Sequence, residues 1–341
     1  MTAGQSLEAQ FYTRGMKPLE TLEPDGIREV IDCPLCGNAG HSPVTRPIPD
    51  GECHGLEEPW RSMRFQMVKC RECGLIYQRI RPRRDDIGRF YSGEYGCYES
   101  FVQRGPIVRA LAQFSARRLV ATVERLRPPG NDVFLDFGCG IGAWMELFAS
   151  IDAPWTMVGT EIATELIRRV EALGFPGMVC DDSNLDQFFA PSSIGVVHMH
   201  HVIEHVQNPL ALLRTLRELL VPGGIIIGQT PESDCLERRL YGDYWVQWHL
   251  PRHLVIFDKA SMRTHAERAG LEVVALKSSP SGAVVWGASL LKYRALRRGR
   301  PYRWMREPLH PYLMLLFAPL SLVQSVVTNT SHMDFILRKP V

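Results

Sequence analysis

Between residues 133 and 337, short apolar runs alternate with longer segments in which apolar positions recur at helical spacing. An uninterrupted apolar run of about four to eight residues is typical of a buried strand, and recurrence every three or four positions indicates an amphipathic helix. The pattern predicts strands over 133–137, 155–160, 177–180, 195–199, 225–228, 271–277 and 333–337. It predicts helices over 143–148, 162–173, 209–220 and 259–269. Such alternation favours an α/β fold with a doubly wound, seven-stranded, Rossmann-like sheet.

The chain before residue 131 lacks this alternation. We expect residues 1–27 to be a leader, residues 28–84 a cysteine-bearing module, and residues 85–130 a linker and helical lead-in. Within that lead-in, 107–126 has helical spacing and ends at Pro128-Pro129-Gly130. Residues 131–341 are then the sheet domain, and a length of 341 residues suits about two domains.

Two pairs of cysteines, Cys33/Cys36 and Cys70/Cys73, each have two residues between them and a glycine after them. Such knuckles direct four thiolates at one tetrahedral ion, so the spacing predicts a structural zinc ribbon. The long segment between the pairs also holds Cys53 and His54, either of which can replace one of the four ligands. The alternative is a set of unrelated buried or redox cysteines. A site closed by four thiolates has no open position for a substrate, so this zinc is not expected to be catalytic.

A basic segment followed by an apolar one interrupts the pattern near the carboxyl end, over residues 285–328. Six arginines occupy 294–306, and 309–327 is mostly apolar but contains Pro311 and Pro319. The favoured interpretation is a helical insertion before the last strand, which covers the site or pairs with a second copy in a homodimer. Peripheral membrane contact through 294–327, or arginines that bind an anionic substrate, are the alternatives.

Net charge, the amino-terminal residues and the number of cysteines argue against some classes of protein. The formal net charge is +2, so no strong field favours a nucleic-acid partner. The first ten residues hold no apolar stretch, which argues against a secretory signal. Nine cysteines are an odd number, and four of them sit in metal-like pairs, so a reducing cytoplasm is expected.

The most specific chemistry follows the first predicted strand, where Asp136 is succeeded by Gly138, Gly140 and Gly142 and then by a helix. Glycines let the backbone turn sharply beside a ligand, as in nucleotide-binding α/β proteins. The glycines alone also satisfy a loose dinucleotide fingerprint. A carboxylate at the strand tip, however, repels a pyrophosphate and suits a cofactor that carries an ammonium and a sulfonium. The stretch resembles the glycine-rich motif of class I S-adenosylmethionine (SAM) methyltransferases.

That resemblance implies roles for residues at the ends of the following strands. Glu161 is expected to accept the ribose hydroxyls, and Asp181, with Asp182 as the alternative, to contact adenine. His200 and His201 are expected at the cofactor rim. The implied SAM-binding residues are Asp136, Gly138, Cys139, Gly140, Glu161, Ile162, Asp181, His200 and His201. The last strand is expected to run antiparallel at the sheet edge, as in this family.

Two further motifs point to the acceptor side. Val202-Ile203-Glu204-His205-Val206 resembles the V-L-E-H-V motif of methyltransferases that include ubiquinone-pathway enzymes, and implies that His205 lies near the reacting centre; the alternative is helix-start capping. The segment 245–257 resembles the W-x5-P-R-H-L-x-x-F segment of a subgroup from glycan and natural-product pathways. Histidine suits proton transfer near neutral pH, so His249 or His253 is a candidate general base or substrate anchor. Alternatively, Arg252 and His253 hydrogen-bond the backbone and fix this segment.

These motifs together predict a SAM-dependent methyltransferase that acts on a small molecule, natural-product intermediate or glycan by in-line displacement. Two alternatives remain open at this point. One is a protein with this fold that binds SAM without methylating, for example one that closes a ring with a radical-enzyme partner. The other is an NAD-dependent dehydrogenase, which Asp136 and the Glu204-His205 pair disfavour. A partner enzyme in a biosynthetic pathway is also possible.

Overall fold

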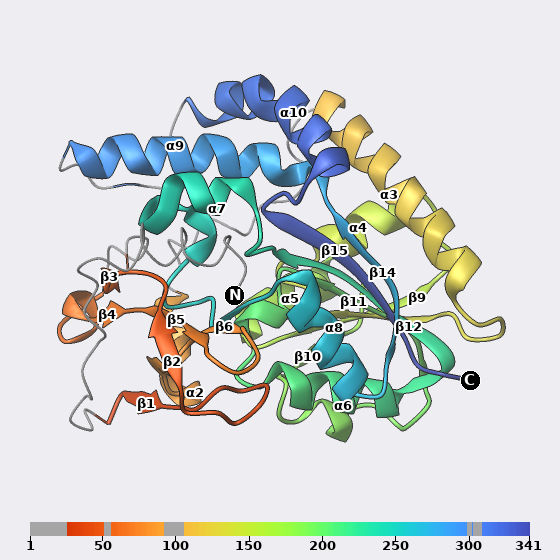
Figure 1. Ribbon diagram of the computed structural model, residues 1–341. Helices are drawn as coiled ribbons and strands as arrows, with labels where there is room; N and C mark the ends of the chain where they lie inside the picture. Colours follow the sequence, from red (N-terminus) through yellow and green to blue (C-terminus); the bar gives the residue numbers. More distant parts are fainter. Residues whose placement is uncertain (1–25, 51–55, 92–105, 299–301, 303–308) are drawn as a thin grey trace. The chain divides into compact units, whose positions relative to one another are not determined.

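The computed structural model describes residues 26–50, 56–91, 106–298, 302 and 309–341 (Figure 1). The chain divides into two compact units, each described by itself below. The cysteine unit comprises Met1–Gly96, Pro231–Met262 and Ser278–Met333, and the sheet unit comprises Cys97–Thr230, Arg263–Lys277 and Asp334–Val341. Predictions that involve Cys53, His54, Arg300, Arg303 or Arg306 fall outside the described residues.

The sheet unit is built on a seven-stranded sheet in the order β10-β9-β8-β11-β12-β15-β14, which agrees with the predicted α/β class. Strands β10, β9, β8, β11 and β12 are parallel. Their bounds, with those of β14 and β15, are β8 Val133–Phe137, β9 Thr156–Glu161, β10 Gly177–Val179, β11 Ile194–His200, β12 Leu220–Pro231, β14 Glu272–Ser278 and β15 His332–Arg338. The helices that connect or precede them are α3 Pro106–Leu126, α4 Ala143–Ala149, α5 Thr164–Ala172, α6 Pro209–Leu219 and α8 Lys259–Arg268.

The last strand runs antiparallel, as the Gly223 N–H to Lys339 O and Lys339 N–H to Gly224 O hydrogen bonds show. The expectation that it forms the sheet edge is wrong, because β15 lies between β12 and β14. Burial explains the order. Phe335 and Leu337 of β15 are fully buried, whereas every position of β14 is partly or wholly exposed. An apolar strand is stabilised more by an interior position, and a polar one tolerates the edge.

The centre of this unit forms around β8, whose last four residues are buried. Phe134 stacks on Trp155 with ring centroids 4.5 Å apart and meets Phe148 edge-on at 5.4 Å. Helix α5 presents Leu166, Ile167 and Val170 inward at helical spacing. Full burial of each such side chain contributes about 1.5–3 kcal/mol. This core fixes the carboxyl end of β8, from which the glycine turn departs.

The cysteine unit holds small sheets rather than one large one. A four-stranded sheet has the order β13-β6-β5-β2, and β1 pairs with β7 and β3 with β4. The bounds are β1 Arg28–Val30, β2 His41–Pro43, β3 Ile48–Pro49, β4 Arg64–Phe65, β5 Met67–Cys70, β6 Ile76–Gln78, β7 Ile80–Pro82 and β13 Val255–Ile256. The pairing of β13 with β6 joins the Pro-Arg-His-Leu segment to the cysteine-bearing sheet, although about 180 residues separate them in sequence.

Helices complete the cysteine unit. They are α2 Arg84–Ile87, α7 Leu236–Tyr241, α9 Ala283–Arg297 and α10 His310–Val327, with short 3-10 turns at Trp60–Ser62, Gly88–Phe90, Gly242–Tyr244, Val246–Trp248 and Pro280–Gly282. Helices α9 and α10 pack side by side (Figure 1), with Trp286 stacked on Phe317. Gly287 permits this approach, because a Cβ atom there would lie 3.0 Å from the Cβ of Leu313.

Candidate cofactor, histidine and metal sites

The turn after β8 departs from a buried carboxylate. Asp136 is 2% exposed, and its Oδ1 accepts a hydrogen bond from Nδ1 of His198 at 2.8 Å. Its Oδ2 has no hydrogen-bond partner among the described residues. An unpaired buried carboxylate oxygen carries a desolvation cost that a cationic ligand offsets. Asp136 therefore fits the ammonium group of SAM. Sequence reasoning missed His198, because a histidine inside an apolar strand gives no signal beyond packing.

The backbone beyond Asp136 requires glycine. Gly138 has φ +74°, and a Cβ atom there would lie 2.7 Å from Cγ2 of Val202. Gly140 has φ +55°, also in the left-handed region. The N–H groups of Gly138 and Cys139 both donate to the carbonyl oxygen of Thr160 at 2.9 Å, which ties the turn to β9. A turn free of side chains at two positions leaves room for a ligand against its backbone.

Glu161 ends β9, the strand beside β8. Its Oε2 accepts the Gly140 N–H at 3.0 Å, and its Oε1 accepts the Ile162 N–H at 2.8 Å. Burial raises the pKa of the Glu161 carboxyl above its ordinary value, against the lowering effect of these N–H donors. An ionised carboxylate has about four acceptor positions, so both oxygens retain capacity for the two hydroxyls of a ribose. The predicted residues Asp136, Gly138, Gly140 and Glu161 thus meet around one turn.

Three other predicted cofactor residues, Asp181, Ile162 and Cys139, make no side-chain hydrogen bond to Asp136 or Glu161 that we describe. Asp181 Oδ1 accepts the Ser183 N–H at 2.7 Å and the Ser183 hydroxyl at 2.5 Å, so that oxygen closes a local turn. Ile162 is half exposed. Cys139 is buried, and burial raises the pKa of its thiol, which leaves it unreactive.

Both ring nitrogens of His201 face acceptor oxygens. Its Nδ1 lies 3.0 Å from Oε1 of Glu204, and its Nε2 lies 3.2 Å from Oε1 of Gln229. A carboxylate oxygen and an amide oxygen both accept hydrogen bonds, so these two partners hold the ring in place. Gln229 is held in this orientation because its amide nitrogen donates to Asp334.

Glu204 is the fully buried partner of that imidazole. Burial alone favours the neutral acid, but the hydrogen bond from His201 and the attraction between the two groups lower the pKa of Glu204 below its ordinary value. The second carboxylate oxygen accepts the Thr230 hydroxyl at 2.9 Å. The His201 ring is therefore anchored to a buried carboxylate. Its neighbour His200 lies with its ring 4.9 Å from that of Trp144.

The prediction that Glu204 and His205 begin a helix is wrong. They lie in a single 3-10 turn, Ile203–His205, and α6 starts separately at Pro209 with Asn208 as its N-cap. The reason is local. The Asn208 side chain accepts the Ala211 N–H, and proline is favoured in the first turn, so the helix begins there.

His249 and His253 belong to the cysteine unit, whereas His205 belongs to the sheet unit. Both are buried, and their rings meet edge-on with Nδ1 of His249 3.4 Å from Nε2 of His253. Nδ1 of His253 lies 2.7 Å from the carbonyl oxygen of Gln247. Since a carbonyl only accepts, this Nδ1 carries a proton. His249 occupies a left-handed backbone conformation, with φ +37°.

Arg252, which lies between these histidines in sequence, connects this segment to other parts of the cysteine unit through hydrogen bonds. It is fully buried, and its guanidinium donates to both carboxylate oxygens of Asp50, at 3.1 and 3.0 Å, and to the carbonyl oxygen of Phe90 at 2.7 Å. The amide of Gln78 on β6 adds hydrogen bonds to the carbonyls of Pro251 and His253. These contacts match the alternative in which the segment is fixed through Arg252 and the backbone.

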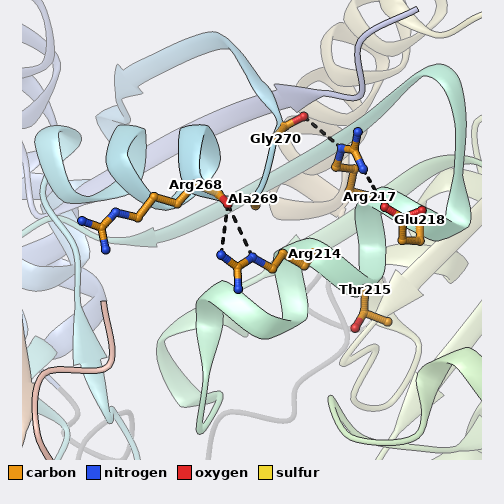
Figure 2. Close-up of a pocket in the computed structure, with 7 residues that line it drawn as sticks. All are labelled: Arg214, Thr215, Arg217, Glu218, Arg268, Ala269 and Gly270. Atoms are coloured by element: carbon orange, nitrogen blue, oxygen red, sulfur yellow. Dashed lines mark hydrogen bonds and ion pairs between the residues drawn. The ribbon is translucent and has the colours of Figure 1, made fainter. Parts of the chain in front are cut away.

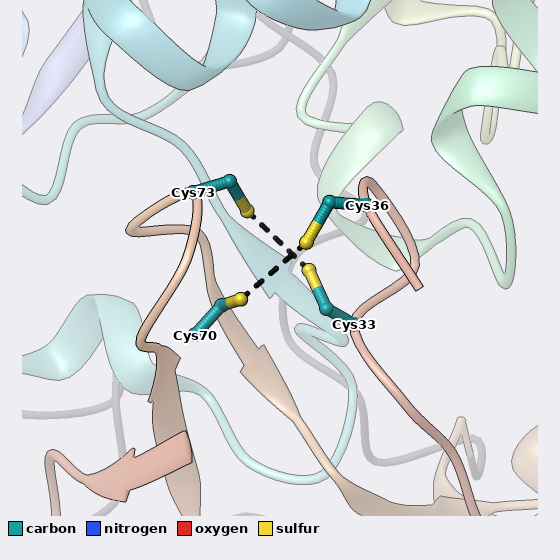
Figure 3. A group of neighbouring side chains, drawn as sticks. All are labelled: Cys33, Cys36, Cys70 and Cys73. Atoms are coloured by element: carbon teal, nitrogen blue, oxygen red, sulfur yellow. Dashed lines mark hydrogen bonds between the residues drawn. The ribbon is translucent and has the colours of Figure 1, made fainter. Parts of the chain in front are cut away.

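The four predicted metal ligands converge in the cysteine unit, with their sulfur atoms pointing toward one another (Figure 3). Sγ of Cys33 lies 3.5 Å from that of Cys73, Sγ of Cys36 lies 3.5 Å from that of Cys70, and all four lie within 4.8 Å of one another. Zinc bonds of about 2.3 Å place tetrahedral sulfurs about 3.8 Å apart. None of the four is in a disulfide.

Burial affects the ionisation of two thiols in this cluster. Burial raises the pKa of the Cys33 thiol far above its ordinary value and that of Cys73 to about 11. These thiols keep their protons unless a cation replaces them. The Gly37 and Gly74 N–H groups donate to the carbonyls of Cys33 and Cys70, so both knuckles close with the same turn.

A surface pocket of about 520 Å³ lies elsewhere in the sheet unit, at the carboxyl ends of α6 and α8 (Figure 2). Arg214 and Arg217 line it, but they donate to the carbonyls of Arg268 and Gly270. Because α6 leads directly into the start of β12, the pocket lies at the edge of the parallel strands opposite the glycine turn. It is therefore not the cofactor site.

Comparison with known proteins shows which proteins this chain is similar to. Residues 110–276 match the family model described as "Methyltransferase domain". The chain is 32% identical over 169 residues to the ubiquinone biosynthesis O-methyltransferase of Cereibacter sphaeroides strain ATCC 17025, which covers 46% of this chain and 66% of that protein. It is 26% identical over 188 residues to the trans-aconitate 2-methyltransferase of Rhodopseudomonas palustris, over 52% of this chain and 72% of that protein.

For other relatives the alignment covers a smaller fraction of the relative's own length. The alignment spans 52% of the Xanthomonas campestris strain B100 ubiquinone biosynthesis O-methyltransferase, at 32% identity. Among solved structures, a phosphoethanolamine N-methyltransferase of Haemonchus contortus is 16% identical, over 78% of this chain and 64% of that one, with a TM-score of 0.45. The domain match covers β8, the glycine turn and Glu161, so residues 110–276 form a SAM-dependent methyltransferase domain.

Proposed function

We propose that the protein transfers the methyl group of SAM to an oxygen of a small-molecule acceptor by direct in-line displacement. One observation carries the proposal. A buried carboxylate with an unpaired oxygen, Asp136, stands at the end of one strand, and Glu161 ends its neighbour across a glycine turn. The O-methyltransferases among its relatives support oxygen as the acceptor atom. A glycan hydroxyl is the second acceptor class, supported by the Pro-Arg-His-Leu segment.

In this proposal the sheet unit holds the cofactor through charge and hydrogen bonding. When bound, SAM supplies a sulfonium-activated methyl group that needs no further activation by the protein. Oδ2 of Asp136 would accept from its ammonium, and the Glu161 oxygens from its ribose. Asp181 would accept from the adenine amino group. Orientation of the reactants by such contacts contributes about 7–11 kcal/mol to catalysis.

The acceptor hydroxyl must lose a proton, and the His249–His253 pair is our candidate for that step. With Nδ1 of His253 donating to Gln247, Nε2 of His253 carries the lone pair and faces Nδ1 of His249. That arrangement is typical of a base held in one tautomer by a backbone carbonyl. A positioned base contributes roughly a hundred- to ten-thousandfold in rate. Both ring nitrogens of His201 already face acceptor oxygens, so we do not assign it this role.

We also propose that Cys33, Cys36, Cys70 and Cys73 hold a structural zinc ion. The sulfur spacing and the matching turns that close the two knuckles support it. All four protein ligands occupy the tetrahedron, so the ion has no place in the transfer step. Its contribution is to the folding of a unit with only short strands, on the order of 10 kcal/mol.

Calorimetric titration with S-adenosylhomocysteine (SAH) tests the cofactor half of the proposal, with NAD as the control ligand. We expect SAH to bind and NAD not to bind. Mass spectrometry of a phenolic or carboxylic acceptor panel incubated with SAM tests the transfer, since a methylated product gains the mass of one CH2 group. Binding of SAH without any methylated product would instead favour a protein that uses SAM as a scaffold. Absence of SAH binding by folded protein would refute the proposal.

A further inference from the structure

Helix α10 is built with its polar side inward and its apolar side outward. The side chains of His310, Ser321 and Gln324 are buried, whereas large apolar side chains on the opposite side are exposed. Leu316 is 69% exposed, Val323 is 62% exposed and Val326 is 83% exposed. A helix on the surface of a globular protein shows the reverse pattern. A contiguous apolar face of this kind marks an interaction surface.

Hydrogen bonds hold the helix in this orientation. The Gln324 amide donates to the buried carboxylate of Glu237 and to the Asn329 carbonyl, each at 2.8 Å, and its oxygen accepts the Trp286 indole N–H at 2.9 Å. The Ser321 hydroxyl donates to the Pro280 carbonyl at 2.8 Å. Rotation of α10 to bury its leucines would break these bonds and remove the Gln324 donor from Oε2 of the buried Glu237 carboxylate. The exposed face is thus fixed by the fold.

The inward polar contacts also exclude a helix that is surrounded by lipid. By length and composition α10 passes as a candidate membrane-crossing helix, with 17% of it buried. Its 18 residues span about 27 Å, short of the roughly 30 Å hydrocarbon core. One side of it is bonded to the cysteine unit, so only the other side can meet lipid. The geometry suits a helix that lies along a membrane surface.

Charge at the end of the neighbouring helix α9 distinguishes the possible occupants. The last turns of α9, which packs against α10, expose Arg294, Arg297 and Arg298. The described parts of α9 and α10 contain no acidic residue. In a symmetric pair of chains, each copy would bring the same basic end and the same uncharged apolar face to the interface, and neither helix would supply an acidic group to pair with the arginines. In a membrane surface, anionic lipid headgroups can pair with the arginines, and acyl chains can pack against the apolar face.

We infer that the exposed face of α10, with the basic end of α9, binds the surface of an anionic lipid bilayer. The inference is independent of the methyl acceptor and of the zinc site. It assigns a role to the insertion that the transfer chemistry does not use.

Flotation with vesicles of phosphatidylglycerol and phosphatidylcholine in equal parts tests it, with pure phosphatidylcholine for comparison. The wild-type chain is expected to float with the mixed vesicles and to bind the neutral ones about a hundredfold more weakly, because three basic residues each contribute roughly fivefold. The double variant Leu316→Glu, Val323→Glu should lose binding to both. The triple variant Arg294→Gln, Arg297→Gln, Arg298→Gln should bind the mixed vesicles roughly a hundredfold more weakly.

Two control variants separate an effect at α10 from a general effect of added or lost charge. Val30→Glu replaces an exposed apolar residue of the same unit, and Arg61→Gln, Arg64→Gln, Arg71→Gln removes three exposed arginines away from α10. Both controls should float like wild type. The variants alter exposed side chains, and an unchanged thermal transition checks that they fold. If wild type stays unbound, or if the controls lose binding equally, the inference is refuted. Dimerisation through α10 without flotation would assign the face to a second copy.

Discussion

The sharpest test of the cofactor site is the substitution Glu161→Gln. The carboxylate accepts two backbone N–H groups, one on each oxygen, from Gly140 and Ile162. A glutamine keeps the shape but can accept on one side only. Its NH2 group must then face one of these two N–H donors, and that donor loses its partner. The change therefore disturbs the glycine turn and removes a charged acceptor at the same time.

The magnitude follows from these contacts. Hydrogen bonds to a charged group contribute about 1.5–3 kcal/mol each, against about 0.5–1.5 kcal/mol for neutral ones. Replacing two charged ribose contacts by neutral or lost ones costs about 2–4 kcal/mol of SAH binding. The dissociation constant for SAH should rise roughly thirty- to thousandfold. The free energy of unfolding without ligand should change far less, since removal of a buried charge offsets part of the lost backbone bonding.

Isothermal titration calorimetry with SAH measures this change, and Glu165→Gln, an exposed acid on α5, is the matched control. The control should bind SAH like wild type. If Glu161→Gln bound SAH within about threefold of wild type while the control also did, the ribose role of Glu161 would be wrong. An equal loss in both variants would point instead to a general effect of charge near the site.

Four further predictions follow from the same contacts. Burial raises the pKa of Glu161, so the folded chain holds this proton more tightly than the unfolded chain; SAH affinity, measured by titration across pH, should fall as pH decreases through that raised pKa and be restored above it. Cys70→Ser should remove the bound zinc, about one per chain by metal analysis, and lower solubility before it lowers the rate of any soluble fraction. His253→Ala should reduce kcat by roughly a hundredfold or more with SAH affinity unchanged; equal kcat at saturating acceptor excludes it as base. Arg252→Leu should lower the free energy of urea unfolding by about 3–5 kcal/mol, because the buried Asp50 carboxylate loses the Arg252 guanidinium, and the paired change with Asp50→Leu should recover part of it.

The hydrophobic pattern predicted the strands and helices of the sheet unit well, because each of these elements depends on residues that are adjacent in sequence. The apolar run of β8 and the amphipathic α5 follow from residues adjacent in sequence, and strands such as β9 and β11 lie within a residue or two of their predicted bounds. The glycine turn with Asp136 and Glu161 was found for the same reason, since a motif fixes each strand end. The four cysteines were found through the spacing within each knuckle.

The hydrophobic pattern did not predict which strands pair when they are far apart in sequence. Nothing in the sequence of β15 says that it lies between β12 and β14, and nothing in Val255-Ile256 indicates a partner in β6. Such pairings depend on which apolar surfaces remain open once the nearer strands have formed. Likewise, sequence reasoning assigned His205, His249 and His253 to catalysis without knowing which unit holds them.

The histidines show most clearly what the fold adds to the sequence. The side chains are identical, but their hydrogen-bond partners differ. His198 lies against a carboxylate inside the sheet, and His201 lies between Glu204 and Gln229. Nδ1 of His253 lies against a backbone carbonyl, and its Nε2 faces Nδ1 of His249. A general base must start neutral, so the carbonyl-bound histidine is a better candidate than the carboxylate-bound one, whichever motif each belongs to.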